Sequence, residues 1–273
     1  MYTPPAFRED RPEVLHAWIR AHPLGTLVTH GAVGFDAQPV PWWLDVSATE
    51  PLRLLGHVAR ANPLWKTPPA QAAVLVIFAG PGQYISPGWY PTKQEHGRVV
   101  PTWNYVAVHA HGRLVFHDDP AWIRGQMERL TGQMEATQPQ PWTLADAPPD
   151  YLEALLKTVV GVEIVVDRLE GKWKLSQNQP EVNRAGVVAG LTGLADPAAG
   201  EMARLVAGDG NRELGNAGVW SAPEIWDRTF SETLGRRPRL HRKRLWAGCG
   251  RGWVNAWNRG AMASGGRGSA CRT

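Results

Sequence analysis

The sequence is poor in cysteine and contains no long apolar run. Its two cysteines, Cys249 and Cys271, lie near the C-terminus, so a disulfide framework, a zinc-ligand spacing or a catalytic thiol is not expected in the main body. No apolar stretch approaches the ~18 residues of a membrane span, and the start, MYTPPAFRED, lacks the basic and apolar regions of a signal peptide. We therefore expect a cytoplasmic protein that does not enter a membrane.

Several catalytic and nucleotide-binding motifs are also missing. There is no GxGxxG after a first strand and no Walker loop, which excludes the two commonest nucleotide folds. No Ser, His and Asp arrangement sits in a nucleophile elbow. His109 and His111 would share one face of a strand, with His117 nearby, but no third ligand has a recognisable spacing beside them. We therefore expect no metal site.

Positive charge is concentrated at the C-terminal end of the 273-residue chain. Residues 1–208 hold 17 Lys and Arg against 20 Asp and Glu, a net charge of −3, whereas residues 209–273 hold 12 against 5, a net charge of +7. The net charge of +4 and the pI of 9.3 are therefore properties of the tail, and are not evidence that the whole protein binds nucleic acid.

The tail, residues 209–273, has 11 Arg, 11 Gly and 5 Trp, but only 8 Leu, Ile, Val and Phe together. That apolar share lies below the ~20% expected of a folding segment. A disordered appendage, or a stretch translated outside the proper reading frame, is favoured over a basic arm that binds nucleic acid or a membrane surface. We expect one domain over 1–208 and an atypical basic tail over 209–273.

The hydrophobic pattern of the first 208 residues predicts a mainly β (α+β) domain. Helices are expected over 11–21, with Asp10 as N-cap, over 120–134, from Tyr151 onward, and around Met202. Short β-type segments separated by turn residues predict an antiparallel sheet curled into a barrel. These segments are LGTLVTH, FDAQPVPWWLDV, LRLLGHV, AAVLVIFAG, VVPTWNYVAVHAHG, RLVFHD and VGVEIVVDRLEG.

Residues 56–66, GHVARANPLWK, form the first candidate binding stretch. A phosphate needs directional N–H donors and fixed positive charge, and an arginine fork offers both. The candidate residues here are His57, Arg60, Asn62 and Lys66. A solvated polar loop, with Asn62 capping the turn before Pro63, explains the same composition, and both interpretations remain open.

Residues 171–180, GKWKLSQNQP, form the second candidate stretch. On a strand, Lys172 and Lys174 would share one side, with Trp173 opposite. The polar groups that follow, Ser176, Gln177 and Asn178, can hydrogen-bond the edge of a heteroaromatic ring, and the lysines can compensate an anionic one. Ordinary turn composition is the alternative interpretation.

Residues 84–105, YISPGWYPTKQEHGRVVPTWNY, concentrate aromatic side chains and prolines. Pro87, Pro91 and Pro101 rule out a helix here, so residues 84–98 are interpreted as a stiff loop whose Trp89 and Tyr90 seal a subunit contact or overhang a pocket. Only PTWNY is expected to form a strand, which could present Thr102, Trp103 and Asn104 to a ligand.

Several long blocks together resemble the PaiB-like proteins, a family described as FMN-binding negative transcriptional regulators. The resemblance covers about residues 1–206 and rests on MYTPPAFRED, GHVARANPLWK, YISPGWYPTKQEHGRVVPTWNY, the segment from PWTLADAPPD to KLSQNQP, and NRAGVVAGL. It implies a split β-barrel of the flavin-reductase and pyridoxamine-phosphate-oxidase type with peripheral helices. It also implies a homodimer with FMN sites at the subunit interface, and residues 1–208 as the FMN-binding domain.

The resemblance assigns a role to each candidate stretch. His57, Arg60 and Asn62, with Lys66 beside them, become a phosphate cradle. Lys172, Lys174, Ser176, Gln177 and Asn178 become candidates for contacts to the isoalloxazine and ribityl groups. Thr102, Trp103 and Asn104 become candidates for the opposite wall of the site. No catalytic residue is assigned.

Two functions compete. One is a flavin-binding negative regulator that acts on transcription directly or indirectly. The other is an FMN-dependent oxidoreductase acting on a small molecule. A structural dimer without cofactor is a third alternative. Direct DNA binding has little support, because the body has a net charge of −3 and no helix-turn-helix pattern.

Overall fold

The computed structural model of the chain describes residues 1–31, 34–47, 50–66 and 73–208. All of these described residues belong to one compact unit. The expectations for the tail, residues 209–273, therefore lie outside the described residues. The last described helix ends at Ala207, just before that tail begins.

Along the described chain, the strands of one antiparallel sheet are interspersed with short helices. The helices and 3-10 turns are η1 Pro5–Phe7, α1 Pro12–Ala21, η2 Pro63–Trp65, η3 Pro87–Trp89, α2 Lys93–His96, α3 Pro120–Glu135, η4 Leu144–Asp146, α4 Pro149–Leu156, α5 Glu181–Thr192 and α6 Pro197–Ala207. The strands are β1 Arg8–Glu9, β2 Leu24–Gly31, β3 Gly34–Pro41, β4 Trp43–Asp45, β5 Arg53–Ala59, β6 Ala73–Ile85, β7 Thr102–His117 and β8 Val159–Lys174.

The strands form one curled antiparallel sheet. Its order is β3-β2-β6-β7-β8-β5-β4, and β1 pairs with the far end of β8. β3 and β5 are well separated in this order, yet a Cβ on Gly56 of β5 would lie only 3.0 Å from the Pro41 carbonyl oxygen of β3. Because the sheet closes on itself in this way, the predicted mainly β, barrel-like architecture with peripheral helices is confirmed.

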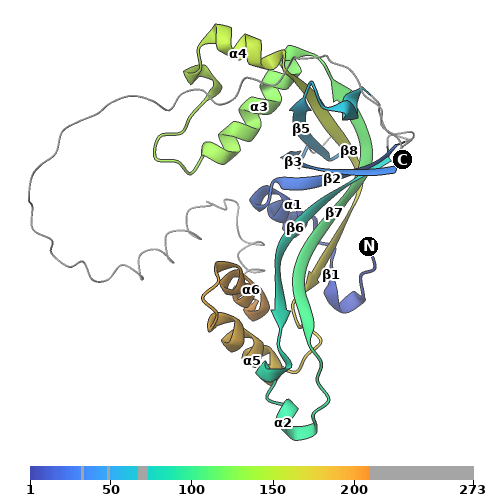
Figure 1. Cartoon of the computed structure of the whole chain (residues 1–273), viewed down its shortest axis with the longest axis vertical. Helices are drawn as coiled ribbons and strands as arrows, with labels where there is room; N and C mark the ends of the chain where they lie inside the picture. The colour runs from blue at the N-terminus through green and yellow to red at the C-terminus, as the bar shows by residue number, and fades with distance from the viewer. Residues whose placement is uncertain (32–33, 48–49, 67–72, 209–273) are drawn as a thin grey trace, which may run out of the picture. The chain divides into compact units, whose positions relative to one another are not determined.

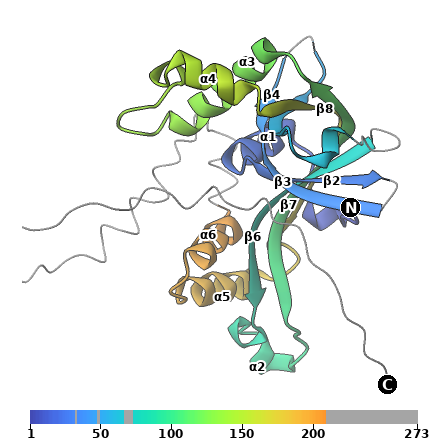
Figure 2. The ribbon, with the colours of Figure 1, turned by 45° about the horizontal axis from the view of Figure 1, so that its top comes forward.

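Helices pack at both ends of this sheet (Figures 1 and 2). α3 and α4 lie together near β5 and the start of β8, where Ile123 and Leu152 belong to a small separate apolar cluster. α5 and α6 pair with each other, and α6 contacts β6. The buried face of α1 joins the main core, where Trp18 meets Trp173 edge to face at 5.4 Å.

Some local predictions were wrong. VVPTWNYVAVHAHG and RLVFHD form the single strand β7, with a register shift between His111 and Gly112. Glycine is needed there because a Cβ at Gly112 would overlap the Val165 carbonyl oxygen. FDAQPVPWWLDV is divided into β3 and β4 at Trp42. Asp10 is not the cap of α1, which begins after Arg11, whose backbone N–H donates to the Glu9 carboxylate (3.0 Å).

The prediction that the prolines rule out a helix in residues 84–98 was wrong, because this segment contains a short helix. α2 occupies Lys93–His96, between Pro91 and Gly97, and Gly97 ends it in the left-handed conformation (φ 64°). α5 was missed as well, because its glycines lower helix propensity. Those glycines have a packing reason: a Cβ at Gly186 or Gly190 would overlap Trp89.

Within the part of the chain that the structure describes, no helix combines the length and the apolar character needed to cross a membrane.

Candidate functional site

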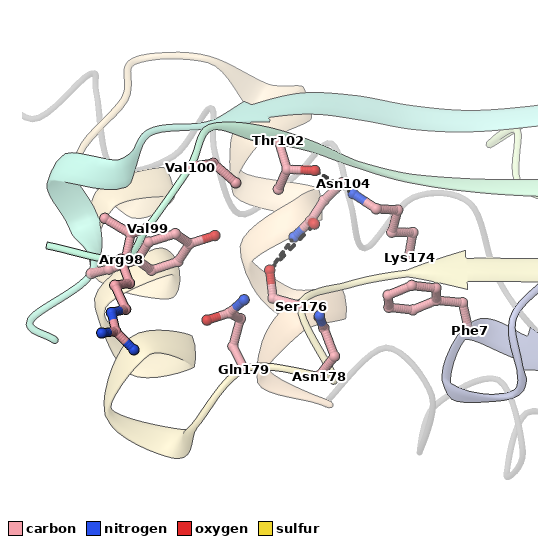
Figure 3. Close-up of a pocket in the computed structure, with 11 residues that line it drawn as sticks. Phe7, Arg98, Val99, Val100, Thr102, Asn104, Lys174, Ser176, Asn178 and Gln179 are labelled. Carbon is pink, nitrogen blue, oxygen red and sulfur yellow. Dashed lines mark hydrogen bonds between the residues drawn. The ribbon is translucent and has the colours of Figure 1, made fainter. Parts of the chain in front are cut away.

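A pocket lies where β7 begins, β8 ends and the turn after β8 folds back (Figure 3). Its volume is about 260 Å³, just below the ~300–1,000 Å³ common for small-molecule sites. Apolar, amide, hydroxyl and cationic side chains share its wall, which consists of Phe7, Tyr90, Arg98, Val99, Val100, Thr102, Asn104, Lys174, Ser176, Asn178 and Gln179.

The centre of the pocket is a buried polar pair. Asn104 of β7 is fully buried and its side chain hydrogen-bonds the Ser176 hydroxyl at 3.0 Å. Ser176 is itself buried and adopts φ 62°, the left-handed conformation that non-glycine residues rarely take. The strained backbone therefore holds the hydroxyl against Asn104. Strain of this kind is commonly retained at binding sites, where it fixes a functional group.

Two cationic side chains lie at opposite ends of this pair (Figure 3). The Lys174 ammonium donates to the Thr102 hydroxyl (2.5 Å) and to the Trp103 carbonyl oxygen. Burial, with a smaller contribution from the charge of Lys172, lowers the pKa of Lys174. Arg98 is exposed, and its guanidinium forms no ion pair with any other described residue. The pocket therefore carries positive charge that it does not itself neutralise.

A hydrogen-bonded brace supports the far wall. The Asn183 side chain on α5 accepts from the Thr92 backbone N–H, and its amide N–H donates to the side-chain Oε1 of the pocket residue Gln179 at 3.1 Å. Beside it, Tyr90 is 4% exposed, and burial raises the pKa of its phenol. Because α5 also packs on Trp89, this helix fixes the aromatic part of the wall.

The structure brings together five of the residues predicted from the second and third stretches: Thr102, Asn104, Lys174, Ser176 and Asn178. The other three lie close by in sequence but do not line the pocket. Trp103 is 57% exposed and meets Tyr84 edge to face. The Lys172 ammonium donates to the Tyr2 carbonyl oxygen (3.1 Å). The Gln177 side chain braces its own turn, between Leu175 N–H and Trp173 carbonyl.

The predicted phosphate cradle lies elsewhere. His57 pairs with Gly161 near the start of β8, 13 residues before Lys174, which corresponds to roughly 40 Å of extended strand. Arg60 is held by the Asp118 carboxylate and by two backbone carbonyls, including that of Lys157 (2.7 Å). A single chain therefore does not place this group in the same pocket as Lys174.

The remaining cradle residues have local partners. The His57 ring is 2.8 Å from the Gln126 side chain. Asn62 caps η2 by accepting from Leu64 N–H (2.9 Å), as the alternative interpretation of this loop predicted, and it also donates to Gln38. Lys66 is exposed at the end of η2.

The sequence analysis did not identify five residues of the pocket wall: Phe7, Arg98, Val99, Val100 and Gln179. It left Tyr90 open between the pocket and a subunit contact. Phe7 comes from η1, far away in sequence, and no pattern linked it to β8. Arg98 follows the αL glycine that ends α2, so its position depends on a helix that the sequence analysis had excluded because of the prolines. An arginine flanked by a glycine and two valines was the only available signal.

The chemistry of the lining favours binding. Among the described residues that line the pocket, none is Asp, Glu or His, the side chains that most often act as general acids and bases. Two cations, amides and hydroxyls can instead hold an anionic group and the polar edge of a ring, while Phe7 and Tyr90 offer apolar faces.

Comparison with known proteins also indicates a binding function. A family model described as "Putative FMN-binding domain" matches residues 1–168, which ends within β8, before Lys174. An uncharacterized protein of Emericella nidulans is 34% identical over 76% of this chain and 96% of its own length. The protease synthase and sporulation protein PAI 2 of Bacillus subtilis is 30% identical, over 76% of this chain and 96% of its own.

Among solved structures, the flavocytochrome Anf3 of Azotobacter vinelandii is a distant likeness. It has 16% sequence identity and a TM-score of 0.45, over 61% of this chain and 69% of that protein.

Proposed function

The chain belongs to the family described as "Putative FMN-binding domain", FMN is its cofactor, and we propose that it is a flavin-binding negative regulator whose FMN lies in the pocket between Arg98 and Lys174. The observation that carries the proposal is the make-up of that pocket. It combines unneutralised positive charge with hydrogen-bond donors, and its described lining offers no carboxylate or imidazole.

FMN fits this set of side chains. It carries a phosphate dianion, a polyhydroxyl chain and a heteroaromatic ring with polar edges. Arg98 and Lys174 match the charge, Asn104, Ser176 and Asn178 match the polar edges, and Phe7 and Tyr90 match the ring faces. When bound, FMN would supply electron- or hydride-transfer chemistry. The chain's own residues would bind and orient it.

A second copy of the chain would complete the site. The pocket of one chain, at about 260 Å³, is small for a cofactor of this size. Beside it Tyr84 and Trp103 are 46% and 57% exposed, and aromatic residues are enriched in subunit interfaces. We propose that a homodimer covers these rings and that the His57–Arg60 loop of the second subunit approaches the same cofactor.

Complementation tests the shared site. A Lys174→Ala chain and an Arg60→Ala chain, each deficient in FMN as a homodimer, would recover about one site per heterodimer when coexpressed, because one of the two sites then keeps both side chains. Lys93→Ala, at an exposed position on α2, is the control partner. If the heterodimer recovers no FMN while each homodimer is folded, the two groups do not share a site.

Regulation through DNA would be indirect, or would require the tail. The first 208 residues have a net charge of −3, whereas direct DNA binding leaves a basic footprint. Loss of repression in a flavin-deficient Lys174→Ala strain, with Lys93→Ala still repressing, would support the regulator. A salt-sensitive gel shift with promoter DNA would show that regulation is direct.

Oxidation of NAD(P)H by the flavin-loaded protein, without any effect on transcription, would instead support the oxidoreductase. The observation that favours this second function is the exposed Arg98 at the pocket edge, where a small co-substrate could bind.

A further inference from the structure

A second cluster of side chains lies on the same two strands but outside the pocket. His109 and His111 occupy alternate positions of β7, so their side chains share one face of the sheet. Glu170 of β8 is the direct cross-strand partner of His109. One ligand atom from each of the three residues lies within 4.8 Å of the others. Spacing along the chain could not reveal Glu170 as a third ligand, because it lies on a different strand from the two histidines.

We propose that His109, His111 and Glu170 bind one divalent transition-metal ion of the zinc, cobalt or nickel class. Two imidazoles and one carboxylate are a ligand set typical of zinc sites that keep further positions open for water. Two ligands about 2.1 Å from one ion are at most ~4.2 Å apart. The observed spread of up to 4.8 Å therefore needs only small side-chain rotations to close around a metal.

The cluster is accessible to an ion from solution. The side chains of His111 and Glu170 are 24% and 27% exposed, and the opposite face of β7, at Val108 and Ala110, is fully buried. The strand backbone is held on both sides, by β6 and β8. The two histidines and the carboxylate are therefore presented on a rigid support, which favours a defined metal geometry.

A metal ion would compete with the present partners of Glu170, and the ligand types restrict which metal can bind. Its carboxylate contacts the Met1 ammonium at 2.6 Å, and Arg168 and His111 at 3.3 Å. A metal would have to displace the ammonium, or use the Met1 nitrogen as a ligand after the loss of its proton. Calcium and magnesium need several oxygen ligands, so this mainly nitrogen site selects against them.

The metal site is separate from the flavin pocket. Glu170 precedes Lys174 by four residues on β8, or about 13 Å of strand. Between them lies Lys172, whose ammonium is occupied by Tyr2. The proposal therefore does not depend on FMN, and FMN binding serves as a check that a variant is folded.

Calorimetric titration of the full chain with zinc chloride tests the proposal, with the absorption of bound Co²⁺ as a second readout. We expect one high-affinity site per chain. His109→Ala and His111→Ala should each weaken it at least about tenfold, since even loss of a supporting group around a metal costs ~10–100-fold. Glu170→Gln, which keeps the shape of the side chain, should do the same.

The matched control is His30→Ala, which removes an exposed strand histidine on β2. It should bind zinc like the unaltered chain. The comparison also separates the cluster from other ligands such as Cys249 and Cys271. If His109→Ala and His111→Ala remain folded and bind zinc as tightly as the control, or if the unaltered chain shows no high-affinity site, the proposal is wrong.

Discussion

Asn104 and Ser176 are 72 residues apart in sequence and share a buried hydrogen bond of 3.0 Å at the centre of the pocket. The bond ties the beginning of β7 to the turn after β8, and it requires Ser176 to hold a positive φ. The pocket therefore depends on a contact between two residues that are far apart in sequence. This contact requires a strained backbone at Ser176.

Substitutions at Ser176 should separate the strain from the hydrogen bond. Ser176→Ala keeps the strained φ and leaves the buried Asn104 amide without its partner, which should cost about 1–3 kcal/mol. Ser176→Gly loses the same bond but relieves about 1 kcal/mol of strain. Urea unfolding should therefore show the alanine variant to be the less stable of the two. Equal stabilities, or the reverse order, would contradict the strain account.

Arg98 and Lys174 can be assigned to ends of the cofactor by comparing FMN with riboflavin, which lacks the phosphate. Loss of a charged hydrogen bond costs about 1.5–3 kcal/mol, or roughly 10–100-fold in affinity. Replacing the cation nearest the phosphate by alanine should weaken FMN binding by this factor. The same replacement should weaken riboflavin binding much less. Lys93→Ala, on the exposed face of α2, is the control. If both alanine variants bind FMN as tightly as the unaltered chain, neither Arg98 nor Lys174 belongs to the FMN site.

Gly186 should be more sensitive than an ordinary helical glycine. A Cβ there would overlap the Trp89 carbonyl oxygen, so Gly186→Ala should destabilise the fold by about 1–3 kcal/mol and weaken FMN binding through Tyr90. Gly132 on α3 has nothing within 4 Å of an added Cβ, and Gly132→Ala should stabilise by about 0.5–1 kcal/mol. Thermal unfolding compares the two, and a neutral Gly186→Ala would mean that α5 does not pack as described.

Glu170 should make stability depend on pH under acid conditions. Its pKa in the folded chain is about 2, below its ordinary 4.5, chiefly because of the Met1 ammonium. A lowered carboxyl pKa stabilises the fold above about 4.5, and the stabilisation is lost as pH falls toward 2. Because the side chain is partly exposed, we expect about 1 kcal/mol.

Urea unfolding of Glu170→Gln between neutral pH and pH 2 checks this dependence on pH. The variant should be less stable than the unaltered chain at neutral pH, and the difference should disappear near pH 2. Glu153→Gln, at an exposed position on α4, should show no comparable trend. A constant difference across the range would exclude the ion pair as its cause.

The sheet was predictable because it depends on local alternation. β2 and β5 follow their apolar patterns closely, and the buried face of α1 was visible from the spacing of Val14, Leu15, Trp18 and Ile19. The bulge at Gly112 was not predictable, because it depends on a close approach of the β8 backbone that only the folded sheet reveals.

The site was predictable where it lies on β7 and β8, whose residues face one another across the ladder. The family resemblance, together with side-chain chemistry, grouped His57 and Arg60 with Lys174 around one cofactor. Topology separates them, because β5 pairs with the start of β8 and the pocket lies at its end. Phe7 and Arg98 come from segments whose positions are set by tertiary packing, so composition could not identify them.

We propose above that FMN binds in the pocket of Asn104, Ser176, Arg98 and Lys174. The decisive test is a fluorescence titration of FMN into the cofactor-free chain and into the Arg98→Ala/Lys174→Ala double variant. We expect one FMN per unaltered chain, and at least about a hundredfold weaker binding by the double variant, with its fold intact by circular dichroism. FMN does not bind in this pocket if the unaltered chain binds none, or if the double variant binds it equally well.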